Sequence, residues 1–274
     1  MRLIAVDWSG ARTGAAGKIW LAEVKDGRLL RLESGRGRDQ LAQQLIAEAD
    51  RDPELVVGLD FAFAFPAWFQ EGLGVSDARE LWARVAHQGE RWLQECPPPF
   101  WGPTGSRRPD GQLFRRTELD VRDATGARPK SVFQIAGAGA VGTGSIRGMP
   151  ILHRLATAGF SIWPFDDPAL PLVVEIYPRL FTGPLVKTDP AQRETLLATS
   201  YPELDPEHRR LAAASDDALD AAVSALEMAR HAPELLRLPA ARDAVERLEG
   251  AIWYPDGMPV YRKVQVGGSA VLRG

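Results

Sequence analysis

Two aspartates stand where short runs of apolar residues end. Asp7 follows residues 3–6, and Asp60 follows residues 55–59. A continuous apolar run that ends in a turn signal is typical of a buried strand. A carboxylate at such a place is costly to bury unless it is paired or binds a cation. The alternative interpretation is that each aspartate caps the turn that follows its strand.

The chemistry of this pair depends on how the two strands are placed. If they are parallel neighbours, both carboxylates leave the same edge of the sheet, where open α/β folds bind their ligands. Two such carboxylates repel each other, and a divalent cation relieves the repulsion. Because carboxylate oxygens suit Mg²⁺ or Mn²⁺, the sequence predicts Asp7 and Asp60 as ligands of one of these metals.

A second pair of acids lies three residues apart in the last third of the chain. Asp217 and Asp220 project from the same face of a predicted helix, and small alanine neighbours let that helix pack closely on a sheet. Asp216 is explained more simply as a helix-capping residue. Asp220 lies one turn further and gains little from the helix dipole. We therefore expect Asp217 and Asp220 to join the same metal site.

The apolar run at residues 172–176 also contains an acid, Glu175. Burial of this side chain requires either a metal or a basic partner. Glu175 is therefore either a further catalytic carboxylate or the ion-pair partner of Arg179 or another basic residue. Both interpretations stay open.

The elements that position these acids alternate between strands and helices. Apolar runs predict strands at residues 3–6, 18–24, 28–33, 55–59 and 172–176. Asp26-Gly27 is a strong hairpin signal between the second and third of them. Helical spacing predicts helices near residues 40–49, 191–199, 215–231 and 239–248, and two further helices that start at Pro66 and at Ser76. This order indicates one α/β domain over residues 1–274, with a loop-rich insertion at about 97–150.

Five motifs, taken in order, resemble the family catalogued as domain of unknown function 429. Its members are regarded as predicted nucleases with a ribonuclease H-like fold. The motifs are IAVDWSGA at residues 4–11, GLDFAF at 58–63, KSVFQ at 130–134, VEIYP at 174–178 and DDALDA at 216–221. The resemblance extends over nearly the whole chain, to about residue 255.

The resemblance implies a mixed five-stranded sheet of order 3-2-1-4-5 flanked by helices, in which the first and fourth strands are parallel neighbours. It also implies a two-metal site at Asp7, Asp60, Asp217 and Asp220, as in Holliday-junction resolvases. Those enzymes often have glutamate where this chain has the shorter Asp60. The expected function is hydrolysis of phosphodiester bonds by a nuclease that depends on Mg²⁺ or Mn²⁺.

Two other classes of function remain open. Residues 7–13 also resemble the first phosphate-binding turn of actin-like and sugar-kinase-like proteins, which would make the chain an ATP-binding phosphotransferase or ATPase. A non-catalytic nucleic-acid-binding module is the third possibility. Cleavage without nucleotide, nucleotide hydrolysis, or binding alone would distinguish the three.

The insertion is the candidate for contacts with nucleic acid. Residues 97–150 carry eight basic and four acidic side chains, with aromatic residues among them. Arginine forks beside aromatic rings are used to track phosphates and stack bases. The alternative is a solvated basic loop that pairs with the acidic body. Loop position and the resemblance together nominate Arg116, Lys130 and Gln134 as substrate-binding residues.

Composition places the chain among ordinary globular proteins. Of 274 residues, 36 are acidic and 33 basic, 45% are hydrophobic, and the net charge is −3. One cysteine, Cys96, excludes a disulfide framework and a multi-cysteine zinc site. The sequence has neither a signal-peptide pattern nor an apolar run of membrane-spanning length, so a cytoplasmic protein without a membrane partner is expected. No feature indicates an oligomeric state.

Overall fold

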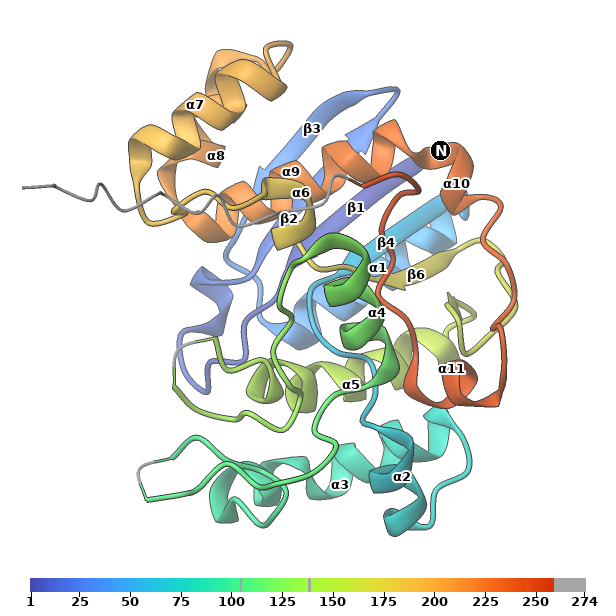
Figure 1. Cartoon of the computed structure of the whole chain (residues 1–274). Coiled ribbons are helices and arrows are strands. Elements are labelled where there is room, and N and C mark those ends of the chain that lie inside the picture. Colours follow the sequence, from blue (N-terminus) through green and yellow to red (C-terminus); the bar gives the residue numbers. More distant parts are fainter. Residues whose placement is uncertain (104, 138, 259–274) are drawn as a thin grey trace, which may run out of the picture.

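The computed structural model describes residues 1–103, 105–137 and 139–258 (Figure 1). Within these residues the centre of the molecule is a six-stranded mixed sheet of order β3-β2-β1-β4-β6-β5. The strands are β1 (Arg2–Asp7), β2 (Trp20–Lys25), β3 (Arg28–Glu33), β4 (Leu55–Leu59), β5 (Ser161–Ile162) and β6 (Leu172–Glu175). The α/β class with a mixed sheet is therefore as predicted.

The predicted strand count and order are wrong at one edge. We expected five strands in the order 3-2-1-4-5, whereas the short strand β5 adds a sixth at the edge beside β6. Because β5 has two residues, it is too short to show any periodicity in the sequence. The strand at Leu172–Glu175 still lies next to β4, as a parallel neighbour.

The strand pairing at the centre of the sheet sets up the site. β1 pairs antiparallel with β2 and parallel with β4. The hairpin between β2 and β3 turns at Asp26 and Gly27, whose φ angles of 50° and 73° are the left-handed values that this turn needs. The predicted hairpin and the predicted parallel adjacency of residues 3–6 and 55–59 are both confirmed.

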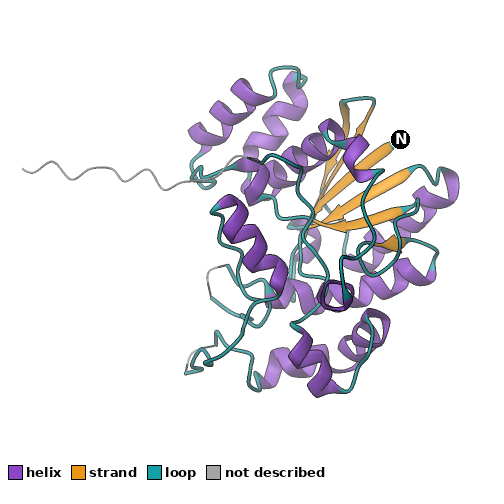
Figure 2. Cartoon of the chain, turned by 45° about the vertical axis from the view of Figure 1, so that its right-hand side comes forward, coloured by secondary structure: helices purple, strands orange, loops and turns teal. Residues whose placement is uncertain are grey.

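Helices cover both faces of the sheet, as Figure 2 shows. Alternate residues of β1 point to opposite cores: Ile4 and Val6 pack with α1, α3 and α5, whereas Leu3 and Ala5 pack with α7, α8 and α9. The helices are α1 (Arg38–Arg51), α2 (Ala67–Leu73), α3 (Ala78–Glu95), α4 (Arg116–Thr125), α5 (Gly142–Thr157), α6 (Arg179–Thr182), α7 (Pro190–Ser200), α8 (Pro206–Ala214), α9 (Asp216–Arg230), α10 (Ala232–Leu235) and α11 (Ala244–Glu249). Among the described residues, no helix is both long and apolar enough to cross a membrane.

The insertion is better ordered than its composition suggests. It contains α4 and the first half of α5, and it buries Phe100, Leu113 and Phe133 in the core shared with α3 and α5. Conversely, the helix expected at 239–248 is reduced to the short α11. The insertion is therefore part of the folded body rather than an appended loop.

Candidate active site

Asp7 and Asp60 lie side by side at one edge of the sheet. Val6 and Leu59 are partners in the parallel register of β1 and β4, and the Asp60 amide donates a hydrogen bond to the Val6 carbonyl oxygen at 3.1 Å. Asp7 and Asp60 therefore each come directly after one of two residues that are partners in the sheet. Asp7 is 8% exposed, and Asp60 is partly buried. Burial and adjacency thus concentrate negative charge at the carboxyl ends of these strands.

Helix α9 brings two further acids to the same place. Its N-terminus is capped by Ser215, whose Oγ accepts a hydrogen bond from the Ala218 amide at 3.0 Å. The helix packs against β1 and β2 through buried alanines (Ala218, Ala221, Ala222, Ala225). Asp220 is buried, Asp217 is partly buried, and Asp216 points to solvent.

The four carboxylates interact strongly. Burial, followed by the charges of Asp60, Asp220 and Asp217, raises the pKa of Asp7 well above its usual range. Burial and the charge of Asp220 raise the pKa of Asp60 to about 8. The pKa of Asp220 is raised to about 6, and that of Asp217 is also raised, in both cases mainly by burial. The structure therefore brings together all four acids that the sequence nominates as metal ligands.

One ammonium group partly balances this charge. Lys187, in the segment between α6 and α7, donates a hydrogen bond to Asp220 Oδ2 at 2.5 Å. Asp220 Oδ1 is buried and has no hydrogen-bond partner among the described residues. Sequence reasoning missed Lys187 because a single loop lysine carries no motif, and its partner is set by tertiary packing.

The donor chemistry of the cluster fits a hard divalent cation. All four acids offer oxygen, and the unpaired Asp220 Oδ1 is a buried acceptor that lacks a positive partner. The described part of the chain nevertheless contains no three histidine, cysteine, aspartate or glutamate side chains already arranged to hold a metal. Lys187 occupies Oδ2 of Asp220, so this carboxylate offers a metal its unpaired Oδ1 unless the ammonium moves away.

Glu175 is engaged by a buried arginine. Its Oε1 accepts from Arg115 Nη2 at 2.5 Å, and its Oε2 accepts from Arg115 Nη1 at 2.8 Å and from the Phe63 amide at 2.9 Å. Arg179, the partner considered from the sequence, instead donates to the Leu185 carbonyl. With both oxygens occupied, Glu175 serves to fix the segment that follows Asp60.

The loop after Asp7 is held by two arginines that the sequence did not single out. Arg38 Nη2 donates to the carbonyl oxygens of Ser9 at 2.7 Å and Ala11 at 2.6 Å, and Arg147 donates to the Gly10 carbonyl. A side chain at Gly10 would collide with the backbone of Gly144, with only 2.5 Å between its Cβ and the Gly144 nitrogen. Gly10 permits this close approach of the two backbones, and it is the only feature of the local sequence that indicates the approach.

Two of the three nominated substrate-binding residues line the same cavity, and the third lies elsewhere. Arg116 forms a two-pronged ion pair with Asp243, at 2.8 and 2.9 Å, which ties α4 to the start of α11. Lys130 and Gln134 line a separate cavity of about 600 Å³. Arg116 thus has a structural partner, whereas Lys130 faces open space.

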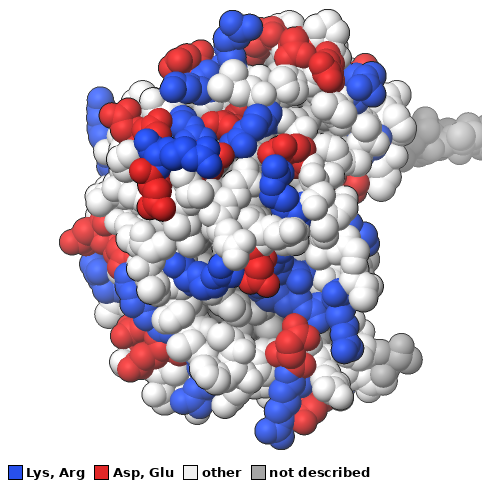
Figure 3. Space-filling model, turned by 180° about the vertical axis from the view of Figure 1, so that it is seen from behind, with Lys and Arg blue, Asp and Glu red and all other residues white. Residues whose placement is uncertain are grey.

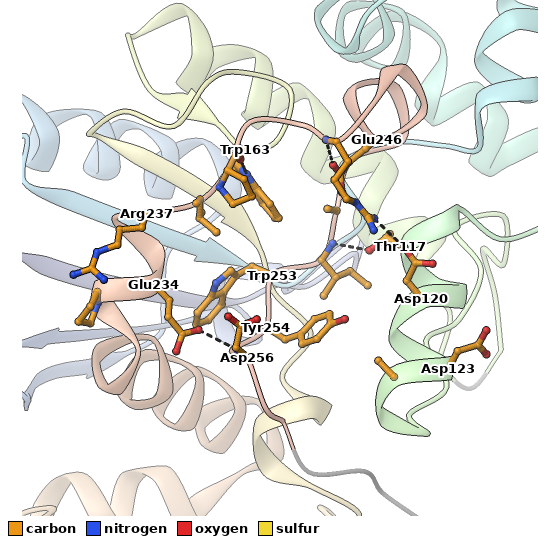
Figure 4. A pocket seen from close by; sticks show the side chains of 17 residues that line it. Thr117, Asp120, Asp123, Trp163, Glu234, Arg237, Glu246, Trp253, Tyr254 and Asp256 are labelled. Atoms are coloured by element: carbon orange, nitrogen blue, oxygen red, sulfur yellow. Dashed lines mark hydrogen bonds and ion pairs between the residues drawn. The ribbon is translucent and has the colours of Figure 1, made fainter.

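A second cavity, of about 700 Å³, lies between α4, α10 and the C-terminal segment (Figure 4). Three of its charged side chains are paired with one another: Arg242 contacts Asp120 at 2.9 Å and Glu246 at 2.8 Å. The Glu234 carboxylate accepts a hydrogen bond from the Asp256 amide at 3.0 Å. None of the site residues nominated from the sequence lines this cavity.

Asp60→Asn is expected to stabilise the metal-free protein at alkaline pH. The pKa of Asp60 is raised from 3.8 to about 8, so between these values the folded chain binds more protons than the unfolded chain. The free energy of unfolding therefore falls as pH rises from about 4 to about 8. Asparagine resembles the protonated acid and removes this contribution, worth about 1–3 kcal/mol.

Urea unfolding with EDTA at pH 5 and pH 8 measures this effect. Asp60→Asn should exceed the wild type in stability at pH 8 by more than it does at pH 5. Asp216→Asn, at an exposed position of the same cluster region, should follow the wild type at both values. If the free energy of unfolding depended on pH equally in Asp60→Asn and the wild type, the raised pKa of Asp60 would be contradicted.

Comparisons of this chain with protein-family models, with curated proteins and with solved structures found no match.

Proposed function

We propose that this protein is a divalent-metal-dependent nuclease with a ribonuclease H-like fold. Asp7, Asp60, Asp217 and Asp220 hold the metal, and phosphodiester bonds are hydrolysed there. The observation that carries the proposal is the gathering of four carboxylates from β1, the end of β4 and α9 around one ammonium group, with a buried oxygen of Asp220 left unpaired.

The arrangement of the sheet also supports the proposal. The series β3-β2-β1-β4-β6 places the same neighbours around the first strand as the resemblance implies, with β6 in the fifth place. The acids leave from the carboxyl ends of β1 and β4, where ligands bind in open α/β sheets. The short edge strand β5 lies beyond β6, away from β1.

The roles of the chain's own groups follow from their contacts. Divalent cations bound here would supply the Lewis-acid chemistry and the water activation that phosphodiester hydrolysis needs. The four aspartates bind and orient, Glu175 fixes the segment after Asp60 through the Phe63 amide, and Lys187 neutralises Asp220 while no metal is bound. Because the ligands must lose their protons first, metal affinity should rise as the pH increases through the raised pKa values of Asp7, Asp60 and Asp220.

Calorimetric titration of Mn²⁺ into nucleotide-free protein tests the proposal. We expect saturable binding by the wild type and at least about 10-fold weaker binding by Asp7→Asn and Asp220→Asn, since each loses one charged ligand. Asp216→Asn is the matched control, because it removes an equal charge from an exposed neighbour on α9. Circular dichroism verifies that all variants fold.

Two results would count against the nuclease. If the wild type binds no Mn²⁺ at millimolar concentration, or if Asp7→Asn binds as the wild type does, the four aspartates are not a metal site. Binding that appears only with ATP, together with ATP hydrolysis, would favour the actin-like phosphotransferase instead.

A further inference from the structure

A basic cavity of about 600 Å³ opens in the insertion, between the segment at residues 101–114, helix α4 and the segment at 126–134. This volume is within the usual range of small-molecule sites. Its lining combines two aromatic rings, Trp101 and Phe114, with basic side chains. Glu118 is the one carboxylate in the lining, and its oxygens accept hydrogen bonds from Arg115.

The basic side chains of this cavity mostly lack acidic partners among the described residues. Among the four that line it, Arg122 pairs with Asp123 at 3.2 Å. Arg108, Arg128 and Lys130 form no ion pair with any residue that the structure describes. On the face of the molecule that Figure 3 shows, basic and acidic side chains are interspersed. The cavity is therefore a local concentration of unpaired positive charge in a protein of net charge −3.

An arginine and two rings form one stacking platform in this cavity. The Arg108 guanidinium carbon lies 5.7 Å from the centre of the Trp101 ring and 5.8 Å from the centre of the Phe114 ring. Both rings are partly buried, so each keeps some surface open. Aromatic faces and guanidinium planes are the two surfaces on which proteins stack unpaired bases.

The platform is held in place by the fold. The Trp101 amide donates to the Phe133 carbonyl at 3.0 Å, and the Ile135 amide donates to the Trp101 carbonyl at 2.8 Å. Gly102 has a φ of 127°, and a Cβ there would lie 2.5 Å from the Ala136 nitrogen. A fixed platform binds with little loss of conformational entropy. These backbone contacts argue against the interpretation of the insertion as a freely solvated basic loop.

A buried network connects the cavity wall to the carboxylate cluster. Glu118 accepts from Arg115 at 2.8 Å, Arg115 binds Glu175, and Glu175 accepts the Phe63 amide just after Asp60. The wall of the cavity and the segment that follows Asp60 are thus joined by a continuous series of buried hydrogen bonds.

We infer that this cavity binds single-stranded nucleic acid, with a base stacked on Trp101, Phe114 or Arg108 and the backbone phosphates on Arg128 and Lys130. In a duplex the bases are stacked on each other and paired, so their faces cannot reach the rings. The inference deepens the proposed nuclease by naming single strands as its substrate class, and in that respect it rests on the proposed function. Binding itself requires no metal.

Fluorescence anisotropy in EDTA measures this binding without cleavage. The probes are a labelled 12-nucleotide single strand, as DNA and as RNA, and the duplex of the same sequence. We expect the protein to bind single strands at least about 10-fold more tightly than the duplex. Trp101→Ala should weaken single-strand binding by about 5- to 150-fold, which corresponds to the loss of one base–aromatic stack.

Salt dependence separates the roles of the rings and the cations. Arg128→Ala and Lys130→Ala should each reduce the slope of log affinity against log salt by about 0.7, the value for one lost phosphate contact on a single strand. Trp101→Ala should leave the slope unchanged. Arg91→Ala is the matched control, because Arg91 is exposed on α3 and pairs with Glu95. Since Arg128 and Lys130 are exposed, these variants test the inference even if Trp101→Ala fails to fold.

Three outcomes would overturn the inference. They are equal affinity for single strand and duplex, wild-type affinity and salt slope in both Arg128→Ala and Lys130→Ala, and displacement of the strand by a nucleoside monophosphate as effective as the unlabelled strand. The last would assign the cavity to a free nucleotide. Asp7→Asn should bind the strand at least as tightly as the wild type does, so a failed metal site and a failed cavity give different results.

Discussion

Replacing Arg115 with methionine is expected to lower the free energy of unfolding by about 3–5 kcal/mol, the usual result of breaking a buried ion pair from one side. Arg115 has no exposed surface. Its guanidinium contacts the carboxylates of Glu118 and Glu175 and the carbonyl oxygen of Glu249. Burial raises the pKa of Glu118 to about 7 even with the arginine present. Without it, two buried carboxylates lose their counter-ion.

The neighbouring arginine provides the control for this experiment. Arg116→Met removes an ion pair of similar geometry with Asp243, but that pair is open to solvent and is screened there. Urea unfolding at pH 7 should therefore place Arg116→Met close to the wild type and Arg115→Met far below it. Similar losses in the two variants would mean that the buried network does not stabilise the fold.

Replacing Asp7 with asparagine is expected to reduce metal-dependent hydrolysis by at least about 100-fold. Asparagine keeps the size of the side chain but offers the metal one neutral oxygen in place of a carboxylate. The substitution also relieves repulsion with Asp60 and Asp220, so the variant should be at least as stable as the wild type. Lost activity in a more stable protein could not be attributed to unfolding.

A panel of single-stranded and duplex DNA and RNA, incubated with Mn²⁺, measures this loss. Asp216→Asn should retain activity near the wild-type level, because Asp216 is exposed at the first turn of α9. Hydrolysis that survives in Asp7→Asn would place the reaction at another site.

The sequence predicted those parts of the site that depend on local pattern. Asp7 and Asp60 end apolar strands, and Asp217 and Asp220 are separated by one helical turn; the structure brings these acids together. Short runs of sequence predict burial and strand pairing, because both features determine the local periodicity and the turn residues.

Partners fixed by tertiary packing could not be predicted in this way. The sequence allowed Glu175 to be either a catalytic carboxylate or an ion-pair partner. Its partner in the structure, Arg115, lies 60 residues away in the chain. Lys187 approaches Asp220 from a loop without a motif.

Helix α5 continues through Pro150, although proline usually ends or kinks a helix. The helix persists because its apolar side buries Ile146, Met149 and Leu152 in the core.

The distribution of the site along the chain has a consequence for its synthesis. Asp7 and Asp60 are synthesised well before Lys187 and Asp220. At about 5–20 residues per second, roughly 6–25 s separate Asp60 from Lys187. A growing chain therefore carries two neighbouring strand-end acids without their ammonium partner and without the helix that completes the cluster. The proposed metal site thus cannot assemble on the growing chain until helix α9 has been synthesised.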